Sequence, residues 1–163
     1  MPSIVINEQL SPLIGVDMTF KNNVTAKVDY KQSRTQTMNF SDFQLIEVKS
    51  KQLTVGAGYK IKGLKLPIKI KGKKIRLDND LSFRFDFSYR DNVTVNHRID
   101  QGVPQITSGS RTITIQPSID YIVSKRLNVR IFFDQTQTIP KISSGFPTTN
   151  TKSGITLRFS LAD

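Results

Sequence analysis

The stretch from Leu81 to Arg90 restricts the fold more than any other part of this sequence. Apolar or aromatic side chains occupy its odd positions, and Ser, Arg or Asp occupies every even position. Because successive side chains of a β-strand point to opposite faces, this stretch predicts a strand with one apolar and one charged face. The charged face is wet, so the apolar face contacts either a protein core or lipid. The residues expected to face lipid in a membrane protein are Leu81, Phe83, Phe85, Phe87 and Tyr89.

The same alternation recurs along the chain and predicts about nine strands. No segment places apolar residues at positions i, i+3, i+4 and i+7 over a useful length, so no helix is expected. The predicted strands lie within residues 16–20, 24–31, 43–49, 53–61, 81–89, 93–95, 113–123, 127–133 and 155–161.

Short and long connections alternate between these strands. Tight turns are expected at 21–23, 49–51, 91–92 and 124–126, and long connections near 31–42, 62–79, 99–110 and 139–152. This alternation is typical of outer-membrane barrels, which have turns at one end and loops at the other. A Greek-key sandwich needs crossovers of irregular length instead.

The predicted fold class is therefore all-β: an antiparallel up-and-down meander of about nine strands, part of a large transmembrane β-barrel. Residues 1–12 are expected to form an N-terminal extension or loop. Residues 13–163 are expected to form the barrel segment, which ends in its C-terminal strand.

Composition limits the functional classes. The formal net charge of +11 favours nucleic acid, anionic lipid or acidic protein as a partner. No run of about 18 apolar residues predicts a transmembrane helix. The absence of cysteine excludes disulfides and thiolate metal sites. The first residues have neither the basic nor the apolar region of a signal peptide, so none is expected.

The polar face of the predicted strands carries mostly cations, which suit a wet pore wall or an ordinary solvated sheet face. The residues expected to face a lumen are Lys27, Arg84, Asp86, Arg130 and Arg158. Tyrosines are expected at both rims of the apolar face, as in barrel aromatic girdles. Tyr89 and Tyr121 are assigned to the short-turn end, and Tyr30 and Tyr59 to the long-loop end. The alternative is that these tyrosines fill the strand ends of a sandwich.

Residues 152–159 fit the pattern polar-x-Gly-x-x-apolar-x-aromatic, which resembles the C-terminal signal read by outer-membrane assembly machinery. A terminal strand with an open hydrogen-bonding edge can add to another sheet, and glycine permits close approach. The residues that carry this expected assembly signal are Lys152, Gly154, Leu157 and Phe159.

Six segments carry a more specific resemblance. They are SPLIGV (11–16), YKIKGL (59–64), FSYRDN (87–92), PSIDY (117–121), SKRLNVR (124–130) and FPTTNT (146–151). In this order they resemble the C-terminal end of the SprA/Sov family, the outer-membrane translocon of the type IX secretion system of Bacteroidota. The likeness extends from about Leu10 to Ala162 and implies one part of a giant single-chain barrel.

The resemblance implies protein transport without chemistry, in the outer membrane of a Gram-negative bacterium. The chain would form a structural wall segment of a pore that exports folded cargo proteins. The implied partners are the remainder of the same large barrel, a PorV-type lateral-gate barrel, periplasmic plug proteins, exported cargo, membrane lipid and lipopolysaccharide. The alternative from another class is a basic soluble β-sandwich that binds a partner protein or nucleic acid.

No catalytic constellation emerges, so neither an enzyme nor a cofactor is expected. His97 is the only histidine, and no cluster of carboxylates surrounds it in the sequence, so it is expected to be incidental. The basic segment from Lys60 to Arg76 is expected to add a hairpin arm, near Leu66–Ile70, that binds anionic glycolipid or a partner protein. This segment contains no aromatic residue on which bases could stack, which disfavours a nucleic-acid partner.

Overall fold

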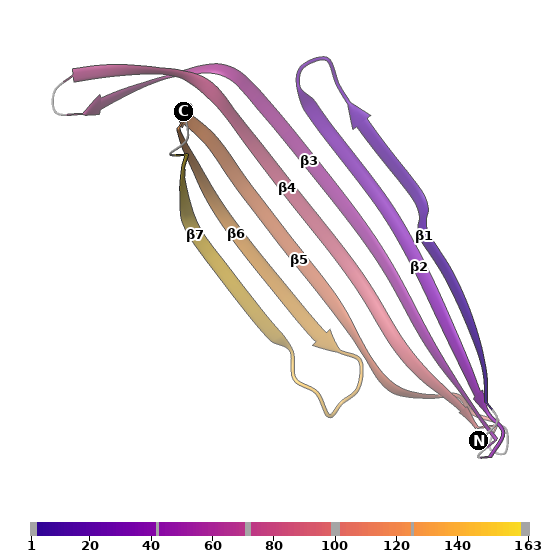
Figure 1. Cartoon of the computed structure of the whole chain (residues 1–163). Coiled ribbons are helices and arrows are strands. Elements are labelled where there is room, and N and C mark those ends of the chain that lie inside the picture. The colour runs from indigo at the N-terminus through magenta and orange to yellow at the C-terminus, as the bar shows by residue number, and fades with distance from the viewer. Residues whose placement is uncertain (1–2, 42, 71–72, 99–101, 125, 161–163) are drawn as a thin grey trace.

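A computed structural model describes residues 3–41, 43–70, 73–98, 102–124 and 126–160. These residues form one antiparallel sheet of seven strands in the order β1 to β7 (Figure 1). The strands are β1 (Ser3–Thr19), β2 (Val24–Asn39), β3 (Gln44–Ile70), β4 (Lys73–Arg98), β5 (Gln105–Ser124), β6 (Leu127–Pro140) and β7 (Thr148–Phe159). Every strand pairs with the next in sequence, so the prediction of an all-β antiparallel meander is confirmed.

The expected count of about nine strands is wrong, because two predicted turns lie inside strands. In the continuous β3–β4 ladder, Lys49 pairs with Val93 and Lys51 pairs with Asp91. The segments 43–49 and 53–61 therefore belong to β3, and 81–89 and 93–95 belong to β4. Polar residues that favour turns elsewhere are held in strand geometry here by cross-strand pairing on both sides.

Most of the predicted long connections are also strand. Ser3–Leu10, expected as an extension or loop, pairs with Gln32–Asn39 of β2. The predicted connection 62–79 is a hairpin in which Leu64 pairs with Asn79 and Ile70 with Lys73. Its tip, residues 71–72, lies outside the described residues. These segments lack regular alternation because neither face is uniformly apolar, so sequence periodicity did not mark them as strands.

The two ends of the sheet differ. The end that we call the turn end holds the β1–β2 turn, the β5–β6 turn and the end of β7, and the β3–β4 hairpin projects there beyond the other strands (Figure 1). The other end, the loop end, holds the ends of β2 and β4 and the connection 141–147. The expectation that 62–79 lies among the long loops is wrong. Two predicted strands are merged into β3, so the chain reaches this hairpin in the opposite direction from the one expected.

Two of the predicted tight turns are confirmed. The Phe20 amide donates to the Val24 carbonyl over 2.8 Å, with Asn23 at a φ of 59°. At the second turn the Ser124 hydroxyl oxygen accepts from the Leu127 amide at 3.1 Å. Residue 125 lies outside the described residues. Asn tolerates the left-handed conformation because its short side chain hydrogen-bonds locally, which explains its place in the first turn.

The sheet is a single layer. Among the described residues no hydrophobic side chain is buried, and the most deeply covered polar residues are Glu47 and Ser118. A sheet with one apolar face normally buries that face against another layer. Since the described residues supply no second layer, whatever covers this face comes from outside them.

Candidate functional site: two faces of one sheet

An apolar belt crosses one face of the sheet. It consists of the side chains on this face within 14–18 of β1, 24–30 of β2, 53–61 of β3, 81–89 of β4, 113–121 of β5, 127–133 of β6 and 155–159 of β7. None of these side chains is charged. On β3 and β4 the belt extends over nine paired residues, Leu53 to Ile61 and Tyr89 to Leu81. Nine residues span about 27 Å along a strand.

All five residues expected to face lipid lie in this belt. They alternate along β4, and Phe83 pairs with Tyr59 on one side and Ile119 on the other. Phe83 is 40% exposed, although it lies in the interior of the sheet. Exposure of this kind along a whole face is far beyond the scattered apolar residues of a soluble surface.

The edge of the belt toward the loop end is straight over most of the sheet. From β1 to β5 it follows one register row, that of Ile14, Tyr30, Leu53, Tyr89 and Ile113. On β7 the edge is Ile155, which the register connects to Tyr59 rather than to Leu53. The edge therefore moves six residues toward the turn end between β5 and β7.

The tyrosines mark both edges of the belt, in a different grouping from that expected. Tyr59 and Tyr121 lie in neighbouring rows at the turn end, while Tyr30 and Tyr89 flank Leu53 in the row nearest the loop end. The assignments of Tyr59 and Tyr89 are wrong, because β3 and β4 run opposite to the predicted directions. The corrected grouping still places two tyrosines at each edge.

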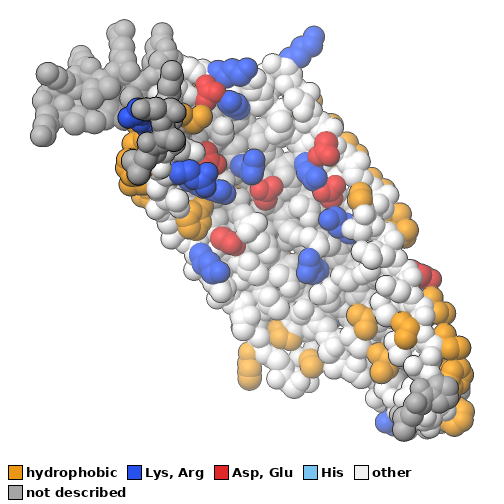
Figure 2. Space-filling model, viewed as in Figure 1, with side chains coloured by type: hydrophobic (Ala, Val, Ile, Leu, Met, Phe, Trp, Pro, Cys, Tyr) orange, Lys and Arg blue, Asp and Glu red, His pale blue; other side chains and the backbone are white. Residues whose placement is uncertain are grey.

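The opposite face is charged over its middle, where Figure 2 shows side chains of both signs, and carries the exposed apolar residues Ile46 and Val48 toward the loop end. All five residues expected to face a lumen lie on it. Lys27 Nζ is 3.1 Å from Asp29 Oδ2 and 3.8 Å from Asp17 Oδ1, and Arg130 Nε is 3.9 Å from Asp120 Oδ1. Such exposed pairs contribute little to stability. They identify a surface that contacts water.

Two adjoining depressions of about 400 Å³ each hollow this polar face. Lys27, Arg84 and Asp86 line the first, and Arg84, Asp86, Arg130 and Arg158 line the second. Gly56 opens the first depression, and a Cβ added to it would lie 2.9 Å from Asp86 Oδ1. The fold thus brings the five residues together along one charged furrow.

The expected assembly signal lies on β7, which pairs only with β6 among the described residues. Leu157 and Phe159 belong to the apolar belt and are 56% and 64% exposed. Lys152 and Gly154 face the polar side, opposite Asp134 and Phe132. β7 therefore has the open edge that the signal interpretation requires.

Gly154 has a local role that the sequence did not reveal. A Cβ at this position would lie 3.0 Å from Cζ of Phe132, so the ring of Phe132 occupies the space above the glycine. An aromatic ring across a glycine covers exposed backbone and fixes the register of the two strands. The same arrangement explains why an aromatic residue is accepted on the polar face.

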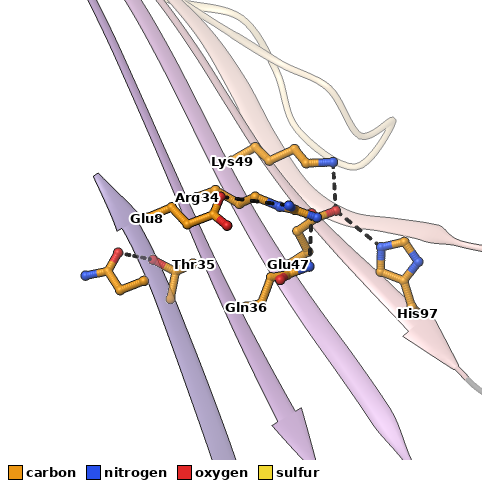
Figure 3. Close-up of polar contacts among 8 residues, drawn as sticks. Glu8, Arg34, Thr35, Gln36, Glu47, Lys49 and His97 are labelled. Atoms are coloured by element: carbon orange, nitrogen blue, oxygen red, sulfur yellow. Dashed lines mark hydrogen bonds and ion pairs between the residues drawn. The ribbon is translucent and has the colours of Figure 1, made fainter. Parts of the chain in front are cut away.

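A charged cluster, missed by sequence reasoning, lies on the belt side of the sheet toward the loop end (Figure 3). It consists of Glu8, Arg34, Glu47, Lys49 and His97. Glu47 is 2% exposed, and its carboxylate oxygens lie 2.7 Å from Lys49 Nζ, 2.5 Å from Arg34 Nε and 3.3 Å from His97 Nε2. These donors, Lys49 foremost, lower the pKa of Glu47 to about 2 against the opposing effect of burial.

His97 is therefore not isolated, contrary to the sequence-based expectation. It lies 50 residues from Glu47 in sequence, and the two meet because β3 and β4 are one continuous ladder. The signal that would have found the cluster is the alternation of Glu47, Lys49 and Lys51, which continues the face of Leu53 in charged residues.

Comparison with protein-family models gave no match, and comparison with curated proteins gave none either. No helix among the described residues is long and apolar enough to cross a membrane. The described residues also contain no group of three or more His, Asp or Glu side chains placed to hold a metal ion.

Proposed function

We propose that this chain is a wall segment of a transmembrane β-barrel in the outer membrane of a Gram-negative bacterium. More specifically, the proposal is a structural part of the type IX secretion translocon, a protein-conducting pore for folded cargo. The apolar belt would face lipid and the charged furrow would face a water-filled lumen. The remainder of the same barrel would pair with the open edges of β1 and β7.

The uncovered apolar belt, which crosses all seven strands, carries this proposal. Barrel strands tilt by about 40° from the membrane normal. At that tilt, the length of the belt along β3 projects to about 21 Å, close to the apolar band of outer-membrane barrels.

The ends of the sheet support an orientation. Outer-membrane barrels have short periplasmic turns and longer extracellular extensions. At the loop end β6 and β7 are joined by the seven residues 141–147, whereas at the turn end β1 and β2 are joined by the four residues 20–23. We therefore assign the loop end to the outside and the turn end to the periplasm. The basic hairpin around 62–79 would then face periplasmic partners rather than the lipopolysaccharide leaflet.

The specific translocon assignment depends on the sequence resemblance, and the exported cargo, the PorV-type gate barrel and the plug proteins follow from it. The charged furrow is compatible with transport, because its wet wall presents charged groups of both signs to a passing folded protein. A soluble β-sandwich is the competing proposal. It needs a second layer to cover the belt, which the described residues do not provide.

Spin labels on single cysteines test the membrane proposal directly, because the chain itself has no cysteine. Labels would replace Arg84, Phe85 and Phe87 in the intact parent protein, reconstituted in lipid after removal of any other cysteines. Labels at 85 and 87 should collide readily with oxygen and poorly with a water-soluble nickel complex, while the label at 84 does the reverse. Protection of 85 and 87 from both reagents would mean a packed core and would support the sandwich.

An immunoblot of fractionated source cells tests the assignment to a giant barrel. An antibody against residues 148–160 should detect an outer-membrane band far above 18.4 kDa. Deletion of β7 should then abolish secretion of cargo that carries the C-terminal export signal. Normal secretion without β7 would contradict the translocon assignment, whereas a soluble band at 18.4 kDa would contradict the membrane proposal as well.

A further inference from the structure

We propose that the outer charged collar, just beyond the apolar belt at the loop end, binds the phosphate groups of a lipopolysaccharide headgroup. The collar is formed on the belt side of the sheet by the cations Arg34, Lys49, Lys51, Arg111 and Lys141 and the carboxylates Glu8, Glu47 and Asp91. This inference rests on the proposed function, because the belt is what places the collar beside a bilayer.

The first tier of the collar is the cluster of Figure 3. The buried carboxylate of Glu47 holds Arg34 and Lys49 at 2.5 Å and 2.7 Å, and Arg34 Nη1 also lies 3.8 Å from Glu8 Oε2. Both cations keep part of their surface in solvent. A guanidinium has five donors, so Arg34 retains donors for a second oxyanion.

The second tier lies one step nearer the belt, in the row of Lys51, Asp91 and Arg111. Asp91 contacts Lys141 and lies 3.8 Å from Arg111 Nε. The side chain of Lys141 reaches Asp91 across Gly109, where an added Cβ would lie 3.1 Å from the lysine Cδ. The absence of a side chain at Gly109 thus lets a cation from the β6–β7 connection join this tier.

The two tiers differ in charge. In the first, Arg34 and Lys49 balance Glu8 and Glu47. In the second, three cations surround the single carboxylate of Asp91, so positive charge remains there to attract an anion. Lys51 forms no ion pair with any residue that the structure describes, and Arg111 contacts Asp91 only at long range. These two side chains are the ones most available to a ligand.

The position of the collar identifies the ligand as a lipid headgroup. The row of Lys51 and Asp91 follows directly on the row of Leu53 and Tyr89, which ends the belt. A lipid whose acyl chains cover Phe87 and Tyr89 therefore places its headgroup against the second tier. Arginine and lysine are suited to phosphate, arginine through paired donors and lysine as a point charge.

The asymmetry of the sheet selects the glycolipid. At the turn end the belt continues to Leu127 and Phe159, the last pair of β6 and β7, and the ion pair that the described residues form there, between Lys60 and Asp80, lies on the polar face. Only the outer leaflet carries lipopolysaccharide, and the collar lies at the end assigned to the outside.

The test compares two double variants of the intact parent protein, purified from outer membranes in mild detergent. The first is Lys51→Gln with Arg111→Gln. The second, a matched control, is Arg84→Gln with Arg158→Gln, which removes the same charge from the polar face. Native mass spectrometry would count bound lipopolysaccharide, and purified lipopolysaccharide and phosphatidylglycerol would be titrated back separately.

The collar variant should retain no more than about one fifth of the lipopolysaccharide that the wild type retains, because it loses the two most available cations. The control variant should match the wild type. Equal retention in all three proteins, or equal loss in both variants, would overturn the collar while leaving the membrane proposal intact. Equal binding of phosphatidylglycerol would overturn the choice of glycolipid. Absence of all three proteins from the outer membrane would overturn the proposed function itself.

Discussion

Two stretches of β3 present odd-numbered side chains to the same face, and their chemistry is opposite. Toward the turn end these are Leu53, Val55, Ala57, Tyr59 and Ile61; toward the loop end they are Glu47, Lys49 and Lys51. The strand is hydrogen-bonded to β2 and β4 through both stretches without a break in register. The backbone pairing is thus the same in both stretches, so the difference in side chains indicates that the surroundings of this face change along the strand.

Each stretch is adapted to its surroundings in a different way. In the belt, stability on the proposed reading comes from lipid contact with side chains that need no partners. In the cluster, Glu47 is covered and ionised, so its stability depends on the donors around it. A charge introduced into the belt and a charge removed from the cluster should therefore destabilise the fold by different amounts.

The largest effect is expected when a charge enters the belt. Phe85→Arg places a cation near its centre, where arginine on the lipid face of a barrel costs about 2–4 kcal/mol. We expect the variant protein to be lost from the folded outer-membrane fraction, measured by heat-modifiable mobility on a gel. Ser82→Arg is the matched control, because Ser82 lies on the polar face opposite Asp120. Equal folding of the two variants would show that the apolar belt is not in lipid.

Glu47→Gln tests the charged stretch and should have a smaller effect. The folded pKa of Glu47, about 2, lies below its ordinary value of 4.5, so ionised Glu47 stabilises the fold above the unfolded pKa. That contribution, at most about 3 kcal/mol, is lost as the pH falls from about 4.5 through about 2. The variant lacks it at every pH.

Hydrogen exchange of peptides from residues 44–50 measures this difference. At pH 5 the wild type should be better protected than Glu47→Gln, and the two should converge near pH 2. His97→Gln is a useful companion, since His97 lies farther from the Glu47 carboxylate than Arg34 and Lys49 do and its loss should cost less. A constant gap between wild type and Glu47→Gln across this range would assign the protection to packing rather than to the ionised carboxylate.

The sequence predicted the belt better than it predicted the connections, for a physical reason. Between Leu81 and Tyr89 one face meets an apolar environment, so strict alternation was required and could be read. From Arg90 to Asn92 every side chain is polar, so the alternation is interrupted and the strand resembled a turn at 91–92. Because turns were predicted at 49–51 and 91–92, inside β3 and β4, the segments 53–61 and 81–89 were expected to run in the opposite directions. This error misplaced Tyr59, Tyr89 and the hairpin.

The charged cluster could not be predicted for a related reason. Arg34, Glu47 and His97 come from three strands, and only the register brings them together. Register depends on the length of every strand and turn between them. The five furrow residues were assigned to their face correctly, because that assignment needs only the parity of each position within its strand.

The smallest effect is expected on the polar side of the belt, where Gly154 underlies the ring of Phe132. Gly154→Ala brings a Cβ to 3.0 Å from the Phe132 Cζ, so the ring must shift, at a cost of about 1 kcal/mol. The folded fraction in the outer membrane should fall modestly, and adding Phe132→Leu to the same protein should restore it. Rescue would identify Gly154 as a steric element of the β6–β7 pair. A defect that persists in the double variant would instead support recognition of Gly154 itself by the assembly machinery, because that role does not depend on the ring above it.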